Sequence, residues 1–165
     1  MGKKIVFLLL IIIALKGCTR DDICPEGTAT TPNLIIVFNN NTNPEIRKSV
    51  EGLSVETDYE NPITVLPTST TDSIAVPLST TSDTTEYRFI QTLITENDTI
   101  VNIDKIMFLY SRQDLYVNRA CGFKTEFQKI GHVLENEGNE NWILNITTDR
   151  DTISDENSAH LTFFH

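Results

Sequence analysis

Three cysteines, Cys18, Cys24 and Cys121, are the residues of this chain best suited to chemistry. A cysteine can act as a nucleophile, bind a metal, accept a lipid or form half of a disulfide. If Cys18 accepts a lipid, Cys24 and Cys121 remain as an even pair, which in an exported protein favours one disulfide. The alternative is two unpaired cysteines, with Cys121 buried as a small apolar residue. A catalytic thiolate at Cys121 is not expected, because the compartment of an exported protein is oxidising.

The N-terminal segment predicts export. Lys3 and Lys4 precede residues 5–15, a run without a single polar side chain. This arrangement is typical of a signal peptide, which we assign to residues 1–17. A helix that spans the bilayer needs about 20 apolar residues, so the run is too short for a permanent transmembrane anchor.

The residues around Cys18 predict a lipid anchor. The segment Leu15-Lys16-Gly17-Cys18 resembles the lipobox of bacterial lipoproteins, although Lys16 stands where a small uncharged residue is usual. The resemblance implies that Cys18 becomes the first residue of the mature protein and carries a diacylglycerol thioether with palmitate-type chains. Several acyl chains together make such an attachment stable, whereas one chain binds reversibly.

The residues after Cys18 carry a second signal. Thr19-Arg20-Asp21-Asp22 resembles the surface-export signal of Bacteroidota lipoproteins, which implies an outer-membrane protein exposed at the cell surface. The alternative is an ordinary charged and solvated linker. If Cys24 is held in a disulfide, the free tether of residues 19–23 spans less than about 20 Å when fully extended. The domain would then lie close to its membrane.

The other candidates for catalysis or metal binding have weaker patterns. His132, His160 and His165 show neither i, i+4 nor His-x-His spacing, so we interpret them as surface or strand-end histidines. The acids near the C-terminus fail the EF-hand calcium pattern, and a solvated acidic turn is the better interpretation. These acids are Asp149, Asp151, Asp155 and Glu156. We expect no catalytic residue, no metal and no cofactor.

The aromatic residues allow two interpretations. Exposed aromatic rings could stack on sugars, but aromatic residues that alternate with aliphatic ones in strands are more often part of the core. We therefore expect core positions. The residues in question are Trp142, Tyr59, Tyr87, Tyr110 and Tyr116.

Four Asp-Ser/Thr pairs resemble the acceptor motif for O-glycosylation of Bacteroidota envelope proteins. In each pair the hydroxyl residue is followed by an apolar residue or by Thr. The resemblance implies that a glycan can be attached to the hydroxyl, although a Thr-rich chain also produces such matches by chance. The candidate acceptors are Ser73, Thr84, Thr99 and Thr152.

The charge of the chain limits its partners. The formal net charge is −10, and removal of Lys3, Lys4 and Lys16 with the signal peptide takes it to −13. An acidic domain repels the phosphate backbone of nucleic acids, so no nucleic-acid partner is expected. An anionic membrane surface would repel it as well, so the lipid must provide the attachment.

Strands with a period of two dominate the chain, whereas helical periodicity is nearly absent. The continuous apolar run of residues 34–38 predicts a central strand, or one partly covered by a loop. Residues 73–78 alternate up to Pro77, which predicts an edge strand or a strand end there. Gly52 interrupts another strand and suggests a β-bulge. Only residues 44–50 could form a helical turn or two.

Further short apolar runs separated by turn residues complete an all-β pattern. We predict a single β-sandwich, immunoglobulin-like or transthyretin-like, with a small β-barrel as the second choice. The expected domains are a signal peptide (1–17), the lipidated cysteine with a short tether (18–24) and the sandwich (25–165). The additional strands are expected near residues 50–55, 63–66, 87–93, 100–103, 106–110, 115–117, 123–127, 142–146 and 161–163.

Several segments together resemble a family of uncharacterised Bacteroidota lipoproteins that is classed as a domain of unknown function. They are residues 21–24, 72–78, 119–124 (Arg-Ala-Cys-Gly-Phe-Lys) and 159–165. The resemblance implies location and supports Cys24 and Cys121 as partners, but it implies no activity. We therefore expect a non-catalytic structural, binding or accessory subunit of the cell envelope. A glycan- or protein-binding module of an uptake complex is the alternative, and a glycan-acting hydrolase is less favoured.

Overall fold

The computed structural model describes residues 23–165. The predicted signal peptide, Cys18 and the tether up to residue 22 lie outside this range. Within the described range no helix has the length and apolar character needed to cross a membrane. The chain divides into two compact units, which we describe separately. The larger is Thr31–Asp114 with Thr125–His165, and the smaller is Leu115–Lys124 with residues 23–30.

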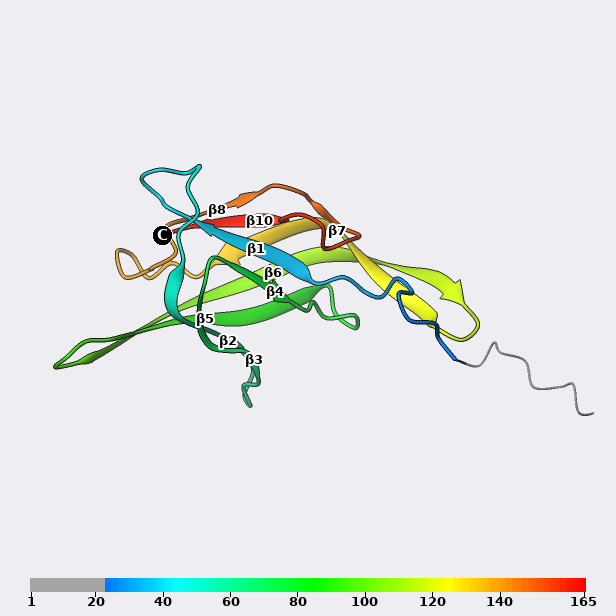
Figure 1. Cartoon of the computed structure of the whole chain (residues 1–165), viewed down its shortest axis with the longest axis horizontal. Coiled ribbons are helices and arrows are strands. Elements are labelled where there is room, and N and C mark those ends of the chain that lie inside the picture. The colour runs from blue at the N-terminus through cyan, green and yellow to red at the C-terminus, as the bar shows by residue number, and fades with distance from the viewer. Residues whose placement is uncertain (1–22) are drawn as a thin grey trace, which may run out of the picture. The chain divides into compact units, whose positions relative to one another are not determined.

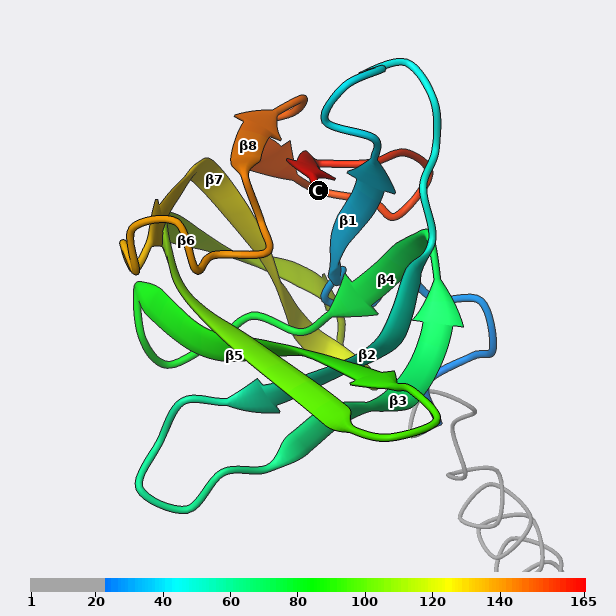
Figure 2. The same cartoon turned by 90° about the vertical axis from the view of Figure 1, so that its left-hand side faces the viewer.

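The described residues form two packed sheets, which confirms the predicted β-sandwich (Figures 1 and 2). Neither of these sheets closes into a barrel, so the second choice was wrong. The four-stranded sheet has the order β4 (Ser73–Val76), β1 (Leu34–Asn39), β10 (Leu161–Phe164), β8 (Asn145–Thr148). The six-stranded sheet has the order β3 (Thr64–Thr71), β2 (Val50–Thr57), β5 (Thr84–Ile94), β6 (Thr99–Asn118), β7 (Gly122–Leu134), β9 (Thr152–Ile153).

β1 is an inner strand, as its apolar sequence predicts. It pairs in parallel with β10 and antiparallel with β4. Leu34, Ile36, Val37 and Phe38 are all buried, because β1 is covered on both sides along most of its length. β4 lies at the edge of its sheet and ends just before Pro77, which has no N–H to offer a neighbouring strand.

The core between the sheets is dominated by phenylalanine. The ring of Phe163 in β10 lies 5.7 Å from Phe38 in β1 and 5.4 Å from Phe89 in β5. Phe89 in turn contacts Phe108 of β6 at 6.4 Å between ring centroids. All four side chains are fully buried, and burial of each stabilises the fold by about 2 to 3 kcal/mol. This cluster joins the two sheets of the larger unit.

Some local predictions were wrong. Residues 44–49 form a loop with a single bridge between Arg47 and Asn39, rather than a helical turn. The three runs expected between residues 100 and 117 belong to one continuous strand, β6. The strand expected from residue 142 begins only at Asn145; Trp142 and Ile143 precede it and are both buried, while Leu144 is 58% exposed.

The carboxylate of Asp104 holds Trp142 and Ile143 in their buried positions before β8. It is fully buried and accepts hydrogen bonds from the backbone N–H groups of Trp142 and Ile143, at 3.4 and 2.7 Å. The indole N–H of Trp142 donates to the carbonyl oxygen of Phe89 at 3.1 Å. These bonds hold the two residues against the core without a sheet ladder. Burial raises the pKa of Asp104 and outweighs the N–H groups, which lower it.

We predict that Asp104→Ala lowers the free energy of unfolding by about 2 kcal/mol, because two buried N–H groups lose their acceptor. Asp104→Asn should cost less, since its amide oxygen can still accept one bond. Urea denaturation of both variants measures the effect. Glu51→Ala, at an exposed position in β2, is the matched control and should change stability little. Equal losses in Asp104→Ala and Glu51→Ala would contradict the role of Asp104.

Candidate functional site

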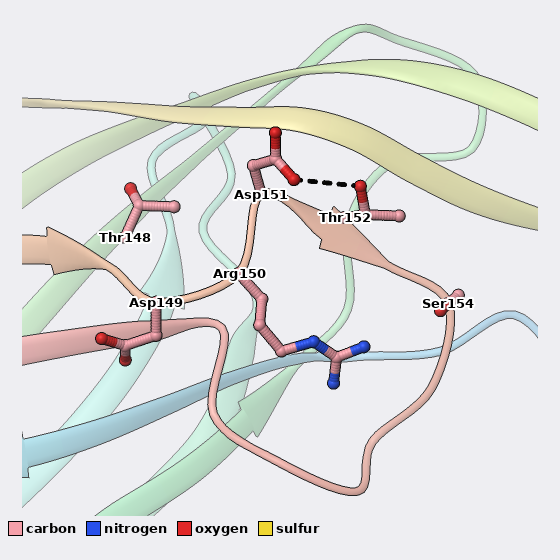
Figure 3. Close-up of a pocket in the computed structure, with 6 residues that line it drawn as sticks. All are labelled: Thr148, Asp149, Arg150, Asp151, Thr152 and Ser154. Atoms are coloured by element: carbon pink, nitrogen blue, oxygen red, sulfur yellow. Dashed lines mark hydrogen bonds between the residues drawn. The ribbon is translucent and has the colours of Figure 1, made fainter.

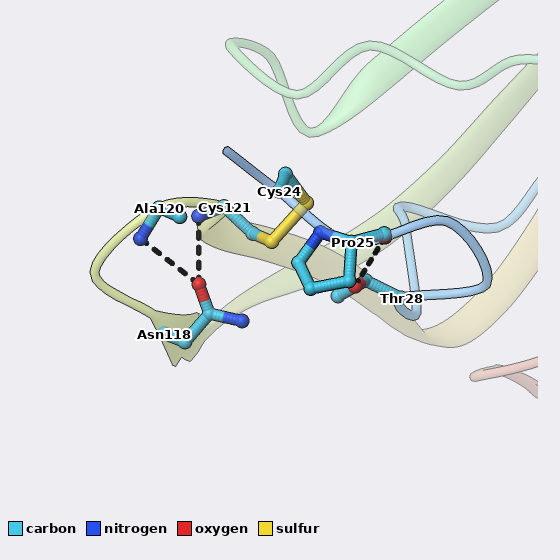
Figure 4. The surroundings of a disulfide bond; sticks show 6 residues. All are labelled: Cys24, Pro25, Thr28, Asn118, Ala120 and Cys121. Carbon is cyan, nitrogen blue, oxygen red and sulfur yellow. Dashed lines mark hydrogen bonds between the residues drawn. A yellow bond between two sulfur atoms is a disulfide. The ribbon is translucent and has the colours of Figure 1, made fainter. Parts of the chain in front are cut away.

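The smaller unit contains the disulfide between Cys24 and Cys121, with the Cα atoms 4.9 Å apart (Figure 4). The pairing expected from the cysteine count is therefore present. We call residues 23–30 and Leu115–Lys124 the tip. Asn118 shapes its turn, because its side-chain oxygen accepts from the N–H groups of Ala120 and Cys121 at 2.9 and 2.8 Å. On the other segment, the Thr28 hydroxyl donates to the carbonyl oxygen of Pro25 at 2.7 Å.

An exposed aromatic pair also belongs to the tip. Tyr116 in β6 and Phe123 in β7 meet edge to face with ring centroids 5.4 Å apart. Their side chains are 62% and 69% exposed. Phe123, Thr125 and Phe127 stand at alternate positions of the strand expected near residues 123–127. Thr125 and Phe127 are buried in the larger unit, but Phe123 lies in the tip and contacts Tyr116 instead.

The other aromatic candidates divide between core and surface. Trp142, Tyr87 and Tyr110 are buried in the larger unit, as expected for core residues. Tyr59 is exposed in the loop after β2, and Tyr116 is exposed in the tip, so the expectation of core positions was wrong for these two residues. The described residues of the larger unit thus contribute one exposed ring from this set, and one ring does not make a sugar-stacking platform.

A surface pocket of about 550 Å³ lies beside the connection from β8 to β9. Figure 3 shows its lining, in which the side chains of Asp149, Arg150 and Asp151 point in three different directions. Asp149 accepts from the Thr162 hydroxyl at 2.6 Å. Asp151 accepts from the Thr152 hydroxyl at 3.1 Å. The carboxylates of this segment therefore do not converge on one point, as a calcium site would require.

The remaining two acids of this segment are also engaged. Asp155 forms a two-pronged ion pair with Arg150, at 3.1 and 3.0 Å, and this pair holds the pKa of Asp155 far below its usual range. Glu156 accepts from the backbone and side-chain N–H groups of Asn33, at 2.7 and 2.9 Å. Over residues 23–165 no group of three or more His, Cys, Asp or Glu side chains is arranged to hold a metal ion.

The three histidines occupy separate structural positions. His160 is fully buried, and its Nδ1 accepts from the Ile35 N–H at 3.0 Å. The ring of His165 meets Trp142 edge on at 5.9 Å, and its Nε2 lies 3.1 Å from the carbonyl oxygen of Lys48. His132 lies in β7. Burial lowers the pKa of all three, so each favours the neutral form at pH 7. His160 stands at a strand end, directly before β10, as one of the two alternatives expected, but it is buried rather than at the surface.

A shallow groove on the outer face of the six-stranded sheet has a volume of about 280 Å³. Its lining includes the apolar residues Met107 and Val133 and the charged residues Asp58, Lys105 and Glu135. Lys105 lies 3.7 Å from each of these two acids, and Asp58 also pairs with Arg88. Such partly exposed ion pairs contribute little to stability, although they place both positive and negative side chains beside the groove.

The four candidate glycan acceptors share one structural feature: each is the first residue of a strand, directly after its aspartate. Ser73 begins β4 and Thr84 begins β5, while Thr99 begins β6 and Thr152 begins β9. Ser73 and Thr99 are exposed, and the other two are partly exposed. The hydroxyl of Thr152 donates to its own aspartate, Asp151, whereas Thr84 lies 3.3 Å from the Ser82 hydroxyl. Ser73 and Thr99 are therefore the most accessible acceptors.

A family model described as a family of unknown function, DUF6452, matches residues 50–165. The chain belongs to this family. The comparisons with curated proteins and with solved structures found no match.

The DUF6452 match is shorter than the resemblance expected over nearly the whole mature chain, because it begins at the first residue of β2. It contains Cys121 but not Cys24, so the disulfide links the matched segment to residues before it. β1 also precedes the match, although it is an inner strand of the four-stranded sheet. The folded domain of this DUF6452 protein thus extends further toward the N-terminus than the matched residues.

Proposed function

We propose that this protein is a lipid-anchored component of a bacterial cell envelope and acts as a structural, binding or accessory subunit without catalysis of its own. The position of Cys18 carries the proposal, because it follows the apolar run of residues 5–15 and the lipobox-like Leu15-Lys16-Gly17. The disulfide between Cys24 and Cys121 supports export, since such bonds persist in oxidising compartments. The engagement of the 149–156 acids within the fold supports a non-catalytic role.

The resemblance of residues 19–22 to the surface-export signal of Bacteroidota lipoproteins supports the outer membrane as the location, with the domain at the cell surface. The short distance from Cys18 to Cys24 supports a domain held close to the bilayer. A subunit of this kind would bind its envelope partner next to the membrane rather than at a distance from it.

The lipid anchor is tested by expressing the full chain in a Bacteroidota host with labelled palmitate. We expect the wild-type chain to carry the label and to remain with the membrane pellet after a high-salt wash. Cys18→Ala should lose the label, while Thr19→Ala, the matched control at the next position, should keep it. The anchor would be disproved if the wild-type chain carried no label and was found in the supernatant.

We also propose that the strand-initial hydroxyls are O-glycosylated. The motif resemblance and the exposure of Ser73 and Thr99 support this proposal. Intact mass of the protein from its native host should exceed the mass of the lipidated chain by hexose-sized increments. Ser73→Ala and Thr99→Ala should each remove one glycan, whereas Thr152→Ala should change the mass least, because its hydroxyl is already bonded to Asp151. Identical masses for the native protein and for protein made in a host without this modification would refute the proposal.

A further inference from the structure

Three observations about the tip bear on what it contacts. The first is its apolar surface. Tyr116 and Phe123 form an aromatic pair that remains exposed to solvent, and the tip also contains Ile23, which is 80% exposed. Scattered exposed apolar residues need no explanation, but two aromatic rings that contact each other outside the core form a local apolar surface. Tyr in particular suits a boundary between an apolar phase and water.

The second observation is a contrast in charge. The tip carries Arg119 and Lys124 against one acid, Glu26, which gives it a formal net charge of +1. The larger unit, Thr31–Asp114 with Thr125–His165, has a formal net charge of −13. Arg20, Asp21 and Asp22 of the tether bring the charge on this side to 0, so an anionic lipid surface repels the larger unit but does not repel the tip. The tip is therefore the described unit whose charge permits contact with such a surface.

The third observation is the attachment of the tip to the segment that leads to Cys18. The disulfide ties Cys121, at the turn between β6 and β7, to Cys24. Only residues 19–23 separate Cys24 from Cys18, a distance of at most about 20 Å. With a lipid on Cys18, the tip stays next to the bilayer at a high effective concentration, so a weak apolar contact is sufficient.

We propose that the tip is a membrane-contact element, in which Tyr116 and Phe123 enter the boundary between lipid headgroups and acyl chains. This inference rests on the proposed lipid anchor at Cys18 and adds the surface of the protein that faces the bilayer. Aromatic side chains concentrate at that depth in membrane proteins. An interfacial element buries its apolar face roughly 5 to 10 Å below the surface, a depth that a side chain of this size can reach. Arg119 and Lys124 remain at the level of the headgroups.

A fluorescence experiment tests the contact. The chain has one native tryptophan, Trp142, which is buried in the larger unit and gives a constant background. Phe123→Trp places a probe in the tip, and Tyr59→Trp places a matched probe at a position of the larger unit that is 53% exposed. Each lipoprotein is purified from membranes and reconstituted in vesicles of phosphatidylcholine brominated near the carbonyl end of its acyl chains. Intact mass records the lipid on each chain.

We expect bromine to remove about half or more of the fluorescence added by Phe123→Trp and almost none of that added by Tyr59→Trp, since quenching requires entry into the bilayer. A lipidated chain with no quenching at either position, as when the tip contacts a protein instead, overturns the membrane contact and leaves the anchor intact. Equal quenching at both positions also overturns it. A chain without lipid mass overturns the anchor, and the inference with it.

Discussion

Replacement of both Cys24 and Cys121 by serine is expected to lower the free energy of unfolding by as much as about 4 kcal/mol. The two cysteines are separated by 97 positions in the sequence, so the bond closes a loop that contains β1 to β6. Opening this loop increases the conformational freedom of the unfolded chain, and the increase grows with loop length. Few single features of a domain of this size contribute as much.

Urea denaturation of the double variant measures this loss, and reduction of the wild-type disulfide should reproduce it. Asn118→Ala is the matched control, because it removes the side chain that bonds Ala120 and Cys121 but leaves the disulfide in place. Its expected cost is about 1 kcal/mol. If the serine variant were no less stable than Asn118→Ala, the disulfide would hold the tip together without stabilising the rest of the chain.

The strands that could be predicted from the sequence are those whose pattern is complete within a few residues. β1 is apolar at five consecutive positions, a pattern typical of a strand covered on both faces. Pro77 marks the end of β4 without reference to any other part of the chain, because its ring removes the donor that pairing needs. Gly52 likewise marks the bulge in β2. Each of these signals is local, and each was correct.

The wrong predictions involve contacts between distant residues. Trp142 was expected to begin a strand, but Asp104 lies 38 positions earlier in the sequence and accepts the N–H groups that a strand partner would otherwise take. Leu144 then turns outward, although Trp142 two positions earlier is buried. A buried aspartate is rare enough that periodicity gives no reason to expect it. The acid lies between Ile103 and Ile106 beside the charged Lys105, so the local sequence does not mark it as a buried residue.

The candidate sites show the same division. The cysteine pair could be predicted because its partners follow from counting. The exposed pair of Tyr116 and Phe123 could not, since alternation identifies side chains that share a face of a strand but not which part of that face is covered. The inner face of the six-stranded sheet is covered by the four-stranded sheet, whose strand order is β4-β1-β10-β8. This order pairs β1 with β10, a strand more than 120 residues later in the chain. Local sequence contains no record of that pairing.

Gly52→Ala is expected to lower the free energy of unfolding by about 3 kcal/mol. Gly52 lies in β2 with φ of +63°, in the left-handed region that favours glycine. A Cβ atom there would lie 1.9 Å from the carbonyl oxygen of Thr92 and 2.9 Å from its carbonyl carbon. Both atoms belong to the backbone of β5, so no side-chain rotation can relieve the overlap. β2 must move away from β5, and the inward side chains Leu53 and Val55 lose part of their packing.

Gly138→Ala separates the two causes of this loss. Gly138 has a φ of +74°, similar to that of Gly52, but a Cβ added there meets no atom within 4 Å. Its variant should show only the cost of the backbone conformation, about 1 kcal/mol. The free energies of unfolding of the two variants, measured by thermal or urea denaturation, should therefore differ by about 2 kcal/mol. This difference is the contribution of the contact with Thr92. If both variants lost the same free energy of unfolding, β2 and β5 could separate at the bulge without cost. The close approach of the two strands would then not stabilise the six-stranded sheet at this point.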